Sequence, residues 1–124
     1  MTPSEAKKFC DRWLPAWSGN QPEKLAAFYS EEALYSDPVI RNGVKGRPAI
    51  LEYFKRLLGR NPHWIWTHLE AFPMEDGFLN KWHARIPVGE KVIECLGVCT
   101  VQFDSAGLIR RNEVYFDRTP LNQE

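Results

Sequence analysis

The side chain in this sequence best suited to chemistry is the carboxylate of Asp37, in an Asp37-Pro38 turn. Residues 28–59 around it predict the end of a short helix, one strand, this turn, a loop bracketed by Gly43 and Gly46, and a longer helix. We expect Asp37 to face the inside of a closed, largely apolar pocket. A carboxylate that loses part of its hydration there becomes a better base and can take a proton from a bound molecule.

Asp37 also has a purely structural interpretation. An aspartate before a proline is common in turns, where its side chain accepts backbone N–H groups of the residues that follow. Both interpretations depend on which other side chains the fold brings to Asp37, and therefore on the elements around it.

Capping signals and helical spacing predict the amino-terminal elements. Residues 2–5, Thr-Pro-Ser-Glu, have the spacing of a capping box and open a helix that places Phe9, Trp13 and Trp17 on one stripe. Pro15 should kink or end this helix, because its ring clashes with the carbonyl four residues earlier.

Three further segments follow before the main sheet. We expect a second, short helix over residues 22–29, a strand over 33–36 and a loop over 40–46. A third helix opens at Pro48, with Gly59 as the residue just beyond its carboxyl end.

From residue 63 onward, the hydrophobic period changes from helical to two. The pattern predicts four strands, over 64–73, 78–87, 91–103 and 108–117, with hairpins at Asp76-Gly77 and Gly89-Glu90. Three helices followed by an antiparallel meander imply an α+β fold in which a curved sheet wraps around the helices. The chain, residues 1–124, is expected to form one domain.

Alternation sorts the strand residues into inner and outer faces. The inner sets are expected to be Asn80, Trp82, Ala84 and Ile86 in the second of these strands, and Cys95, Gly97, Cys99, Val101 and Phe103 in the third. The glycine and the small thiols favour a face that needs room. For the strand 64–73 either face can be the inner one, Trp64, Trp66, His68 and Glu70 or Ile65, Thr67, Leu69 and Ala71.

Composition narrows the classes of partner. Sixteen basic residues balance sixteen acidic ones, and without a basic cluster there is no electrostatic reason to expect nucleic acid. The start MTPSEAKKF lacks the apolar run of a signal peptide and no stretch is long enough to span a bilayer, so we expect a cytoplasmic protein without membrane contact.

The three cysteines are expected to be reduced and buried. Cys95 and Cys99 are four residues apart in one strand, so their Cα atoms lie about 13 Å apart, too far for a disulfide or a shared zinc ion. His63, His68 and His83 show no metal-ligand spacing, so no metal site is expected.

The chain resembles the NTF2-like superfamily, which includes SnoaL-like polyketide cyclases and ketosteroid isomerases. The resemblance rests on the run FYSEEALYSDPV, the turn at 44–47, the helix AILEYF at 49–54, the turn at 103–109 and the closing Tyr-Phe-Asp at 115–117. It implies a cone of three amino-terminal helices on a curved, mainly antiparallel sheet. It also places Asn112, Val114 and Phe116 inside, and a sheet face between two subunits, so that the tryptophan face of 64–73 is a candidate dimer contact.

The resemblance also implies chemical roles. Asp37 corresponds to the general base that moves a proton next to a ketone. The two donors that stabilise the enolate in the isomerases are replaced, a tyrosine by Trp13 and a protonated aspartate by Cys99, which makes steroid isomerisation improbable. Tyr29 matches a supporting tyrosine, and Phe54, with Tyr53 beside it, takes the place of a tyrosine in the third helix.

We therefore expect a cofactor-independent enzyme of the SnoaL-like type, performing an isomerase, cyclase or dehydratase step on a small apolar carbonyl compound. Asp37 is its base, and the expected pocket residues are Trp13, Trp17, Tyr29, Tyr53, Phe54, Trp82, Cys99, Asn112, Val114 and Phe116. Two alternatives stay open. The same cone can bind a hydrophobic ligand or a second subunit without chemistry, or Trp13, Trp17 and Trp82 can fill it and leave no site.

Overall fold

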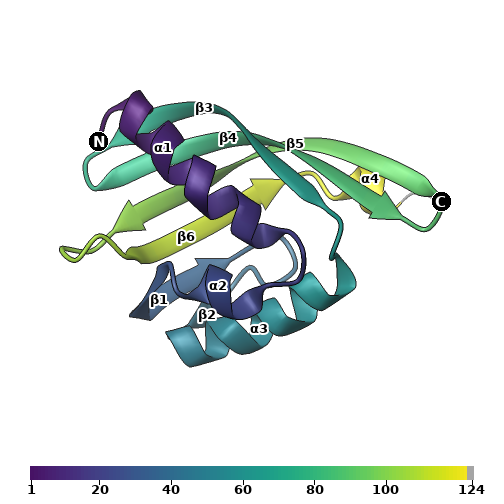
Figure 1. The fold of residues 1–124 in the computed structure, drawn as a ribbon, viewed down its shortest axis with the longest axis horizontal. Helices are drawn as coiled ribbons and strands as arrows, with labels where there is room; N and C mark the ends of the chain where they lie inside the picture. Colours follow the sequence, from purple (N-terminus) through teal and green to yellow (C-terminus); the bar gives the residue numbers. More distant parts are fainter. Residues whose placement is uncertain (123–124) are drawn as a thin grey trace.

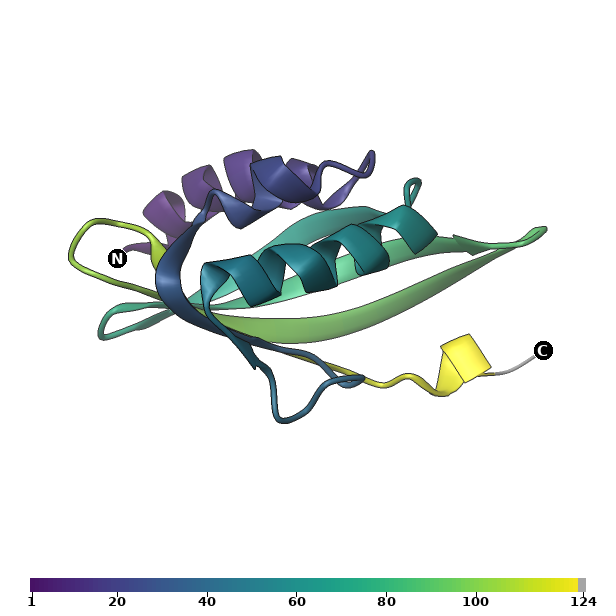
Figure 2. The ribbon, with the colours of Figure 1, turned by 90° about the horizontal axis from the view of Figure 1, so that it is seen from below.

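The computed structural model describes residues 1–122, in which six strands form one curved, open sheet (Figures 1 and 2). The strands are β1 (Tyr29–Ser36), β2 (Val44–Lys45), β3 (Ile65–Met74), β4 (Gly77–Val88), β5 (Lys91–Phe103) and β6 (Ile109–Phe116). Their order across the sheet is β2-β1-β6-β5-β4-β3, and every neighbouring pair is antiparallel except β1 and β6. The expected α+β architecture is confirmed.

The helices are α1 (Pro3–Trp13), the 3₁₀ helix η1 (Leu14–Trp17), α2 (Pro22–Ala26), α3 (Arg47–Arg60) and α4 (Thr119–Asn122). Figure 2 shows α1 and α3 on the same side of the sheet. The capping box is formed, with the backbone N–H of Thr2 donating to Glu5 Oε1 at 2.9 Å and that of Glu5 to Thr2 Oγ1 at 3.1 Å. As predicted, the α-helix stops before Pro15, and the chain continues as the tighter η1.

The structure corrects the region around Tyr29. The second helix ends at Ala26 rather than at Tyr29, and Tyr29 opens β1, which is four residues longer than predicted. This strand pairs in parallel with β6, with Tyr29 opposite Ile109. Because that partner lies 80 residues further along the chain, local sequence patterns could not reveal it. The predicted loop 40–46 also contains the short β2, which pairs with β1.

Two smaller differences concern helix ends. Gly59 lies inside α3, which continues to Arg60, instead of following the helix. The short α4 was not predicted, and the Asp117 side chain caps it by accepting Thr119 N–H at 2.9 Å.

The inner faces of β4 and β5 are as predicted. Asn80, Trp82, Ala84 and Ile86 are buried. Gly97, opposite Trp82 in the β4–β5 ladder, explains why this face needs room: a Cβ atom at Gly97 would lie 2.4 Å from Trp82 Cζ2. The indole of Trp82 therefore occupies the space that a side chain at position 97 would take. On β6, Asn112 and Val114 are buried and Phe116 is half-buried, so the face that the family resemblance favoured is the inner one.

The structure decides which face of β3 is inward. Trp64 is buried and Trp66 half-buried, whereas Ile65 between them is 50% exposed. The predicted dimer contact through the tryptophan face is therefore wrong, because the indoles of Trp64 and Trp66 lie on the concave, inner face of the sheet. An irregularity in the β3–β4 ladder between His68 and Glu70 changes the alternation, so that Ala71 is the next buried residue. A bulge of this kind leaves no signal in strict two-residue periodicity.

No helix within residues 1–122 has the length and apolar character needed to cross a membrane.

Replacing Gly97 by alanine should destabilise the fold by about 1–3 kcal/mol, because the added Cβ meets both Trp82 and the carbonyl oxygen of Tyr115 at 2.7 Å. Urea unfolding measures this. Gly59→Ala is the matched control: Gly59 is helical, and a Cβ atom added there would meet no other atom within 4 Å, so this change should stabilise by up to about 1 kcal/mol. Equal stability of Gly97→Ala and the parent would contradict the close packing of Trp82.

Candidate functional site

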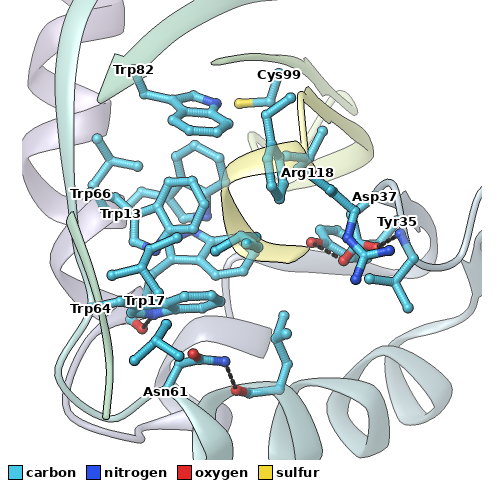
Figure 3. Close-up of a pocket in the computed structure, with 18 residues that line it drawn as sticks. Trp13, Trp17, Tyr35, Asp37, Asn61, Trp64, Trp66, Trp82, Cys99 and Arg118 are labelled. Carbon is cyan, nitrogen blue, oxygen red and sulfur yellow. Dashed lines mark hydrogen bonds between the residues drawn. The ribbon is translucent and has the colours of Figure 1, made fainter. Parts of the chain in front are cut away.

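A cavity of about 240 Å³ lies between the amino-terminal helices and the inner face of the sheet (Figure 3). All five tryptophans of the chain line it: Trp13, Trp17, Trp64, Trp66 and Trp82. Their rings contact one another edge to face, with centroids 4.5 Å apart for Trp66 and Trp82 and 5.0 Å apart for Trp64 and Trp66. The wall is therefore a rigid aromatic surface suited to a flat, apolar ligand.

The cavity is open rather than closed as expected. Among the lining residues, Val39 and Val88 are 59% and 46% exposed, and Arg118 is exposed as well. These side chains mark the mouth, where the turn after β1, the β4–β5 hairpin and the segment before α4 come together.

Seven of the residues singled out in the sequence line this cavity. They are Asp37, Trp13, Trp17, Trp82, Cys99, Val114 and Phe116. Helix α1 and η1 supply Trp13 and Trp17, the turn after β1 supplies Asp37, and β4, β5 and β6 supply the other four.

The other four predicted pocket residues do not line the cavity. Tyr29 and Phe54 are fully buried in the core behind the wall, where the Phe54 ring packs against Trp17 and Tyr35 with centroids 5.2 and 5.1 Å apart. Tyr53 turns its hydroxyl toward Asp37 instead of into the hollow. The family resemblance predicts these residues in the pocket, but Phe54 lies behind the Trp17 ring.

Asn112, the fourth, is fully buried and hydrogen-bonded on both sides of its amide. Its Oδ1 accepts the Tyr29 hydroxyl at 2.7 Å, and its Nδ2 donates to the carbonyl oxygen of Thr100 at 2.7 Å. These bonds tie β1 to β6 and β5. Asn112 is therefore committed to the fold and offers little to a ligand.

The Asp37 carboxylate is held by four hydrogen bonds. Oδ1 accepts the backbone N–H groups of Val39 at 2.9 Å and Ile40 at 3.2 Å. Oδ2 accepts the hydroxyls of Tyr35 at 3.0 Å and Tyr53 at 2.7 Å. The residue is only 7% exposed, so the turn predicted by Asp37-Pro38 and the buried acid predicted for the pocket are both present. All four donors are uncharged groups that stabilise the ionised carboxylate.

The two tyrosines are kept protonated by this arrangement. Burial, followed by the neighbouring Asp37 charge, raises the pKa of Tyr35 well above its ordinary value. Burial also raises the pKa of Tyr53, with the hydrogen bond to Asp37 adding to the effect. Both hydroxyls therefore act as donors near neutral pH.

Two indole N–H groups in the wall have no acceptor. The Nε1 atoms of Trp13 and Trp66 are buried and unpartnered among the described residues. An unpartnered buried donor costs about 1–3 kcal/mol. Cys99, also in the wall, is a neutral thiol, because burial raises its pKa to about 12.

Sequence reasoning missed several lining residues, of which Arg118, Tyr35 and Asn61 carry polar groups. Arg118 follows the last strand, and nothing in its neighbourhood indicates that α4 folds back beside the cavity. The alternation of β1 did contain a signal for Tyr35, two residues before Asp37 on the same strand side. Within residues 1–122, no three or more His, Cys, Asp or Glu side chains gather as they would around a metal ion.

The model of the SnoaL-like domain family matches residues 10–112, which is most of the chain. The chain belongs to the SnoaL-like family. The match runs from within α1 to within β6 and so includes Asp37 and its donors.

Individual relatives agree with the fold of this SnoaL-like domain. A steroid Delta-isomerase of Nocardioides simplex is 39% identical over 56 residues, which are 45% of this chain and 46% of that protein, so the match spans about half of either. A Mycobacterium tuberculosis protein superimposes with a TM-score of 0.78 at 21% identity, covering 94% of both chains. A protein with a ketosteroid isomerase-like fold from Catenulispora acidiphila gives 0.78 at 17% identity, covering 94% of this chain and 88% of its own. At these identities the structures support the fold alone.

Raising the pH above 9 should lower the free energy of unfolding of the SnoaL-like domain. Burial raises the pKa of Cys99 and of Cys10 from 9.0 to about 12, so the unfolded chain loses these protons first. The stabilisation is complete below pH 9 and is lost as the pH rises toward 12. Urea unfolding at about pH 8 and about pH 10.5 measures the loss, and Cys99→Ala should reduce its size. Unchanged stability across this range would contradict buried, protonated thiols.

Proposed function

We propose that this SnoaL-like protein is a cofactor-independent enzyme that moves a proton on a small apolar carbonyl compound, with Asp37 as the general base. One observation carries the proposal: Asp37 is the single carboxylate in the described lining of a cavity whose wall is mainly aromatic and aliphatic. Such a wall binds the hydrocarbon part of a ligand, and the carboxylate supplies the base.

The hydrogen bonds indicate which oxygen takes the proton. A carboxylate has about four lone-pair positions, and four donors occupy them here. The backbone N–H groups on Oδ1 are fixed by the turn, whereas a tyrosine hydroxyl hydrogen rotates about its C–O bond. Oδ2 is therefore the reacting atom, released when the hydroxyl of Tyr35, which lines the cavity, turns away.

The reaction begins with transfer of a proton from the carbon next to the ligand's carbonyl group to Asp37 Oδ2. The electron pair of the broken C–H bond moves to the carbonyl oxygen, and the unpartnered Nε1–H groups of Trp13 and Trp66 are the donors proposed to stabilise it. Return of the proton to another carbon gives an isomerase. Attack of the enolate carbon on a second carbonyl gives a cyclase, and departure of a β-hydroxyl group as water gives a dehydratase.

The cavity favours a ligand smaller than a steroid. Its volume of about 240 Å³ lies below the roughly 300–1,000 Å³ typical of ligand pockets. Trp13 and Cys99 also stand where the resemblance places the two enolate donors of steroid isomerases, and a neutral thiol is a weak donor. The steroid activity in the name of the Nocardioides relative is therefore not proposed for this chain.

A non-catalytic ligand-binding module is the second candidate. It is favoured by the two backbone amides on Asp37 Oδ1 and by the commitment of Asn112 to Tyr29 and Thr100, which leave few polar groups converging on one point. The same aromatic wall would then hold an apolar molecule without changing it.

Asp37→Asn should abolish turnover and cost about 1–2 kcal/mol of stability, since the amide keeps an acceptor for the two N–H groups but loses charge-assisted bonds to the tyrosines. Exchange of the α-hydrogens of small ketones in deuterated water, followed by NMR, detects enolisation before the natural substrate is known. Urea unfolding measures the stability.

Asp104→Asn is the matched control, because Asp104 Oδ1 also accepts two backbone N–H groups, of Ala106 and Leu108, in a turn that contributes nothing to the cavity lining. This variant should keep the exchange rate of the parent. Exchange that persists in Asp37→Asn would assign Asp37 to the fold, and a parent protein without exchange would favour the binding module.

A homodimer through the outer face of the sheet is proposed as the assembly. Ile65, Leu96 and Tyr115 are 50%, 58% and 54% exposed on the strands β3, β5 and β6, on the side of the sheet that faces away from α1 and α3 in Figure 2. Exposed apolar side chains gathered on one face are typical of protein interfaces.

Leu96→Glu should shift the protein from dimer to monomer, because it replaces an exposed apolar side chain of this face by a charge. Analytical ultracentrifugation measures the mass in solution. Ala27→Glu adds the same charge at an exposed position outside the sheet and should leave the dimer intact. A parent protein that sediments as a monomer would overturn the proposed assembly.

A further inference from the structure

The cavity has two charged side chains in its described lining, Asp37 and Arg118, and they are balanced in different ways. The Asp37 charge is stabilised by four hydrogen bonds from uncharged donors. Arg118 forms no ion pair with any residue in the range 1–122. A guanidinium that has no ion-pair partner among the described residues, at the mouth of an apolar cavity, is a ready partner for an anionic group.

The chain holds Arg118 at this place by local structure. The Asp117 side chain accepts both the N–H of Thr119 at 2.9 Å and its hydroxyl at 2.7 Å, which fixes the turn on either side of Arg118. Leu121, one turn further, also lines the cavity, so the segment is turned toward the cavity. Figure 3 shows the Arg118 side chain on the same side of the cavity as Asp37 and Tyr35.

We infer that the ligand of this cavity is an apolar monocarboxylic acid whose carboxylate is bound by Arg118 at the mouth while its hydrocarbon part lies among the tryptophans. The inference rests on the proposed function, since it names the class of ligand for the same cavity. Guanidinium and carboxylate form two parallel hydrogen bonds, which orients the ligand along the cavity. For the proposed reaction, the acid also carries the ketone or aldehyde group next to the carbon that Asp37 deprotonates.

The charge of the site restricts the acid to a single negative charge. Asp37 lies in the same wall, so a second negative charge on the ligand would meet its carboxylate with no further cation in the described lining to balance it. A phosphate ester, with close to two negative charges near neutral pH, fits this arrangement less well than a carboxylate.

Matched acids and primary amides test the inference, because each pair differs mainly in charge. Hydrocinnamic acid and hydrocinnamamide, with a panel of other aryl and alkyl pairs, are titrated against the full chain while tryptophan fluorescence is followed. The five indoles in the wall make that signal sensitive to occupancy. We expect the acids to bind at least about tenfold more tightly than their amides, with a difference that shrinks at high salt.

Arg118→Gln should raise the dissociation constants of the acids at least about tenfold and leave those of the amides unchanged. Arg111→Gln is the control, because Arg111 pairs with Glu113 and is not part of the lining. It should bind both classes as the parent does.

The outcomes separate this inference from the proposed function. Amides that bind as tightly as acids, or an Arg118→Gln variant with unchanged affinity for acids, would overturn the anionic ligand while leaving a cavity for neutral carbonyl compounds. Failure of both classes to bind would remove the small-molecule site itself and this inference with it.

Discussion

The curved sheet imposes the constraint on which the rest of the structure depends: its concave face is apolar and has to be shielded from water. Helices α1 and α3 and the tight turn η1 provide that cover, largely through aromatic side chains. Flat rings pack well against one another but fill a tapering space incompletely. The indole of Trp82 needs the missing side chain of Gly97 to lie flat on the sheet, and the space left beside the five tryptophans is the cavity.

A single acid in such a wall has to be stabilised without being neutralised. Here two amides of its own turn and two phenols from β1 and α3 share the task, and none of them carries charge. The arrangement fixes the orientation of Asp37 while leaving one oxygen among donors that can rotate. The same residues can therefore serve catalysis or simple binding. The difference between the two lies mainly in whether the hydroxyl hydrogens of Tyr35 and Tyr53 can rotate away from Asp37. The aliphatic and indole side chains around Asp37 limit the size of the ligand that can reach it.

The features predicted correctly from the sequence are those determined by neighbouring residues. The Thr2–Glu5 capping box, the two hairpins, and the buried faces of β4 and β5 all arise within a few residues of the chain. The errors involve distant partners. Local spacing predicts a helix at Tyr29, because its strand partner, Ile109, is too far along the chain to leave a local signal. The bulge in β3 interrupts the two-residue alternation from which the inner face of that strand would be predicted.

The same division holds for the site. Asp37 and most of the aromatic wall could be predicted, because the acid sits in a recognisable turn and the tryptophans follow helical or strand spacing. Arg118 could not, since its place depends on how the end of the chain returns past the mouth. Asn112 lies on the predicted face, yet two bonds to Tyr29 and Thr100 remove it from the cavity, and those pairings appear only once the strands are in register.

The parallel pairing of β1 with β6 also affects the order in which parts of the protein can fold. β1 leaves the ribosome early, but its only other neighbour is the two-residue β2, so its main partner is translated about eighty residues later. Until β6 is available, β1 and β2 cannot join the meander β3–β5, and the helices have no continuous sheet to pack on. Closing the long loop between β1 and β6 is therefore expected to limit the rate of folding, whereas the local hairpins can form early.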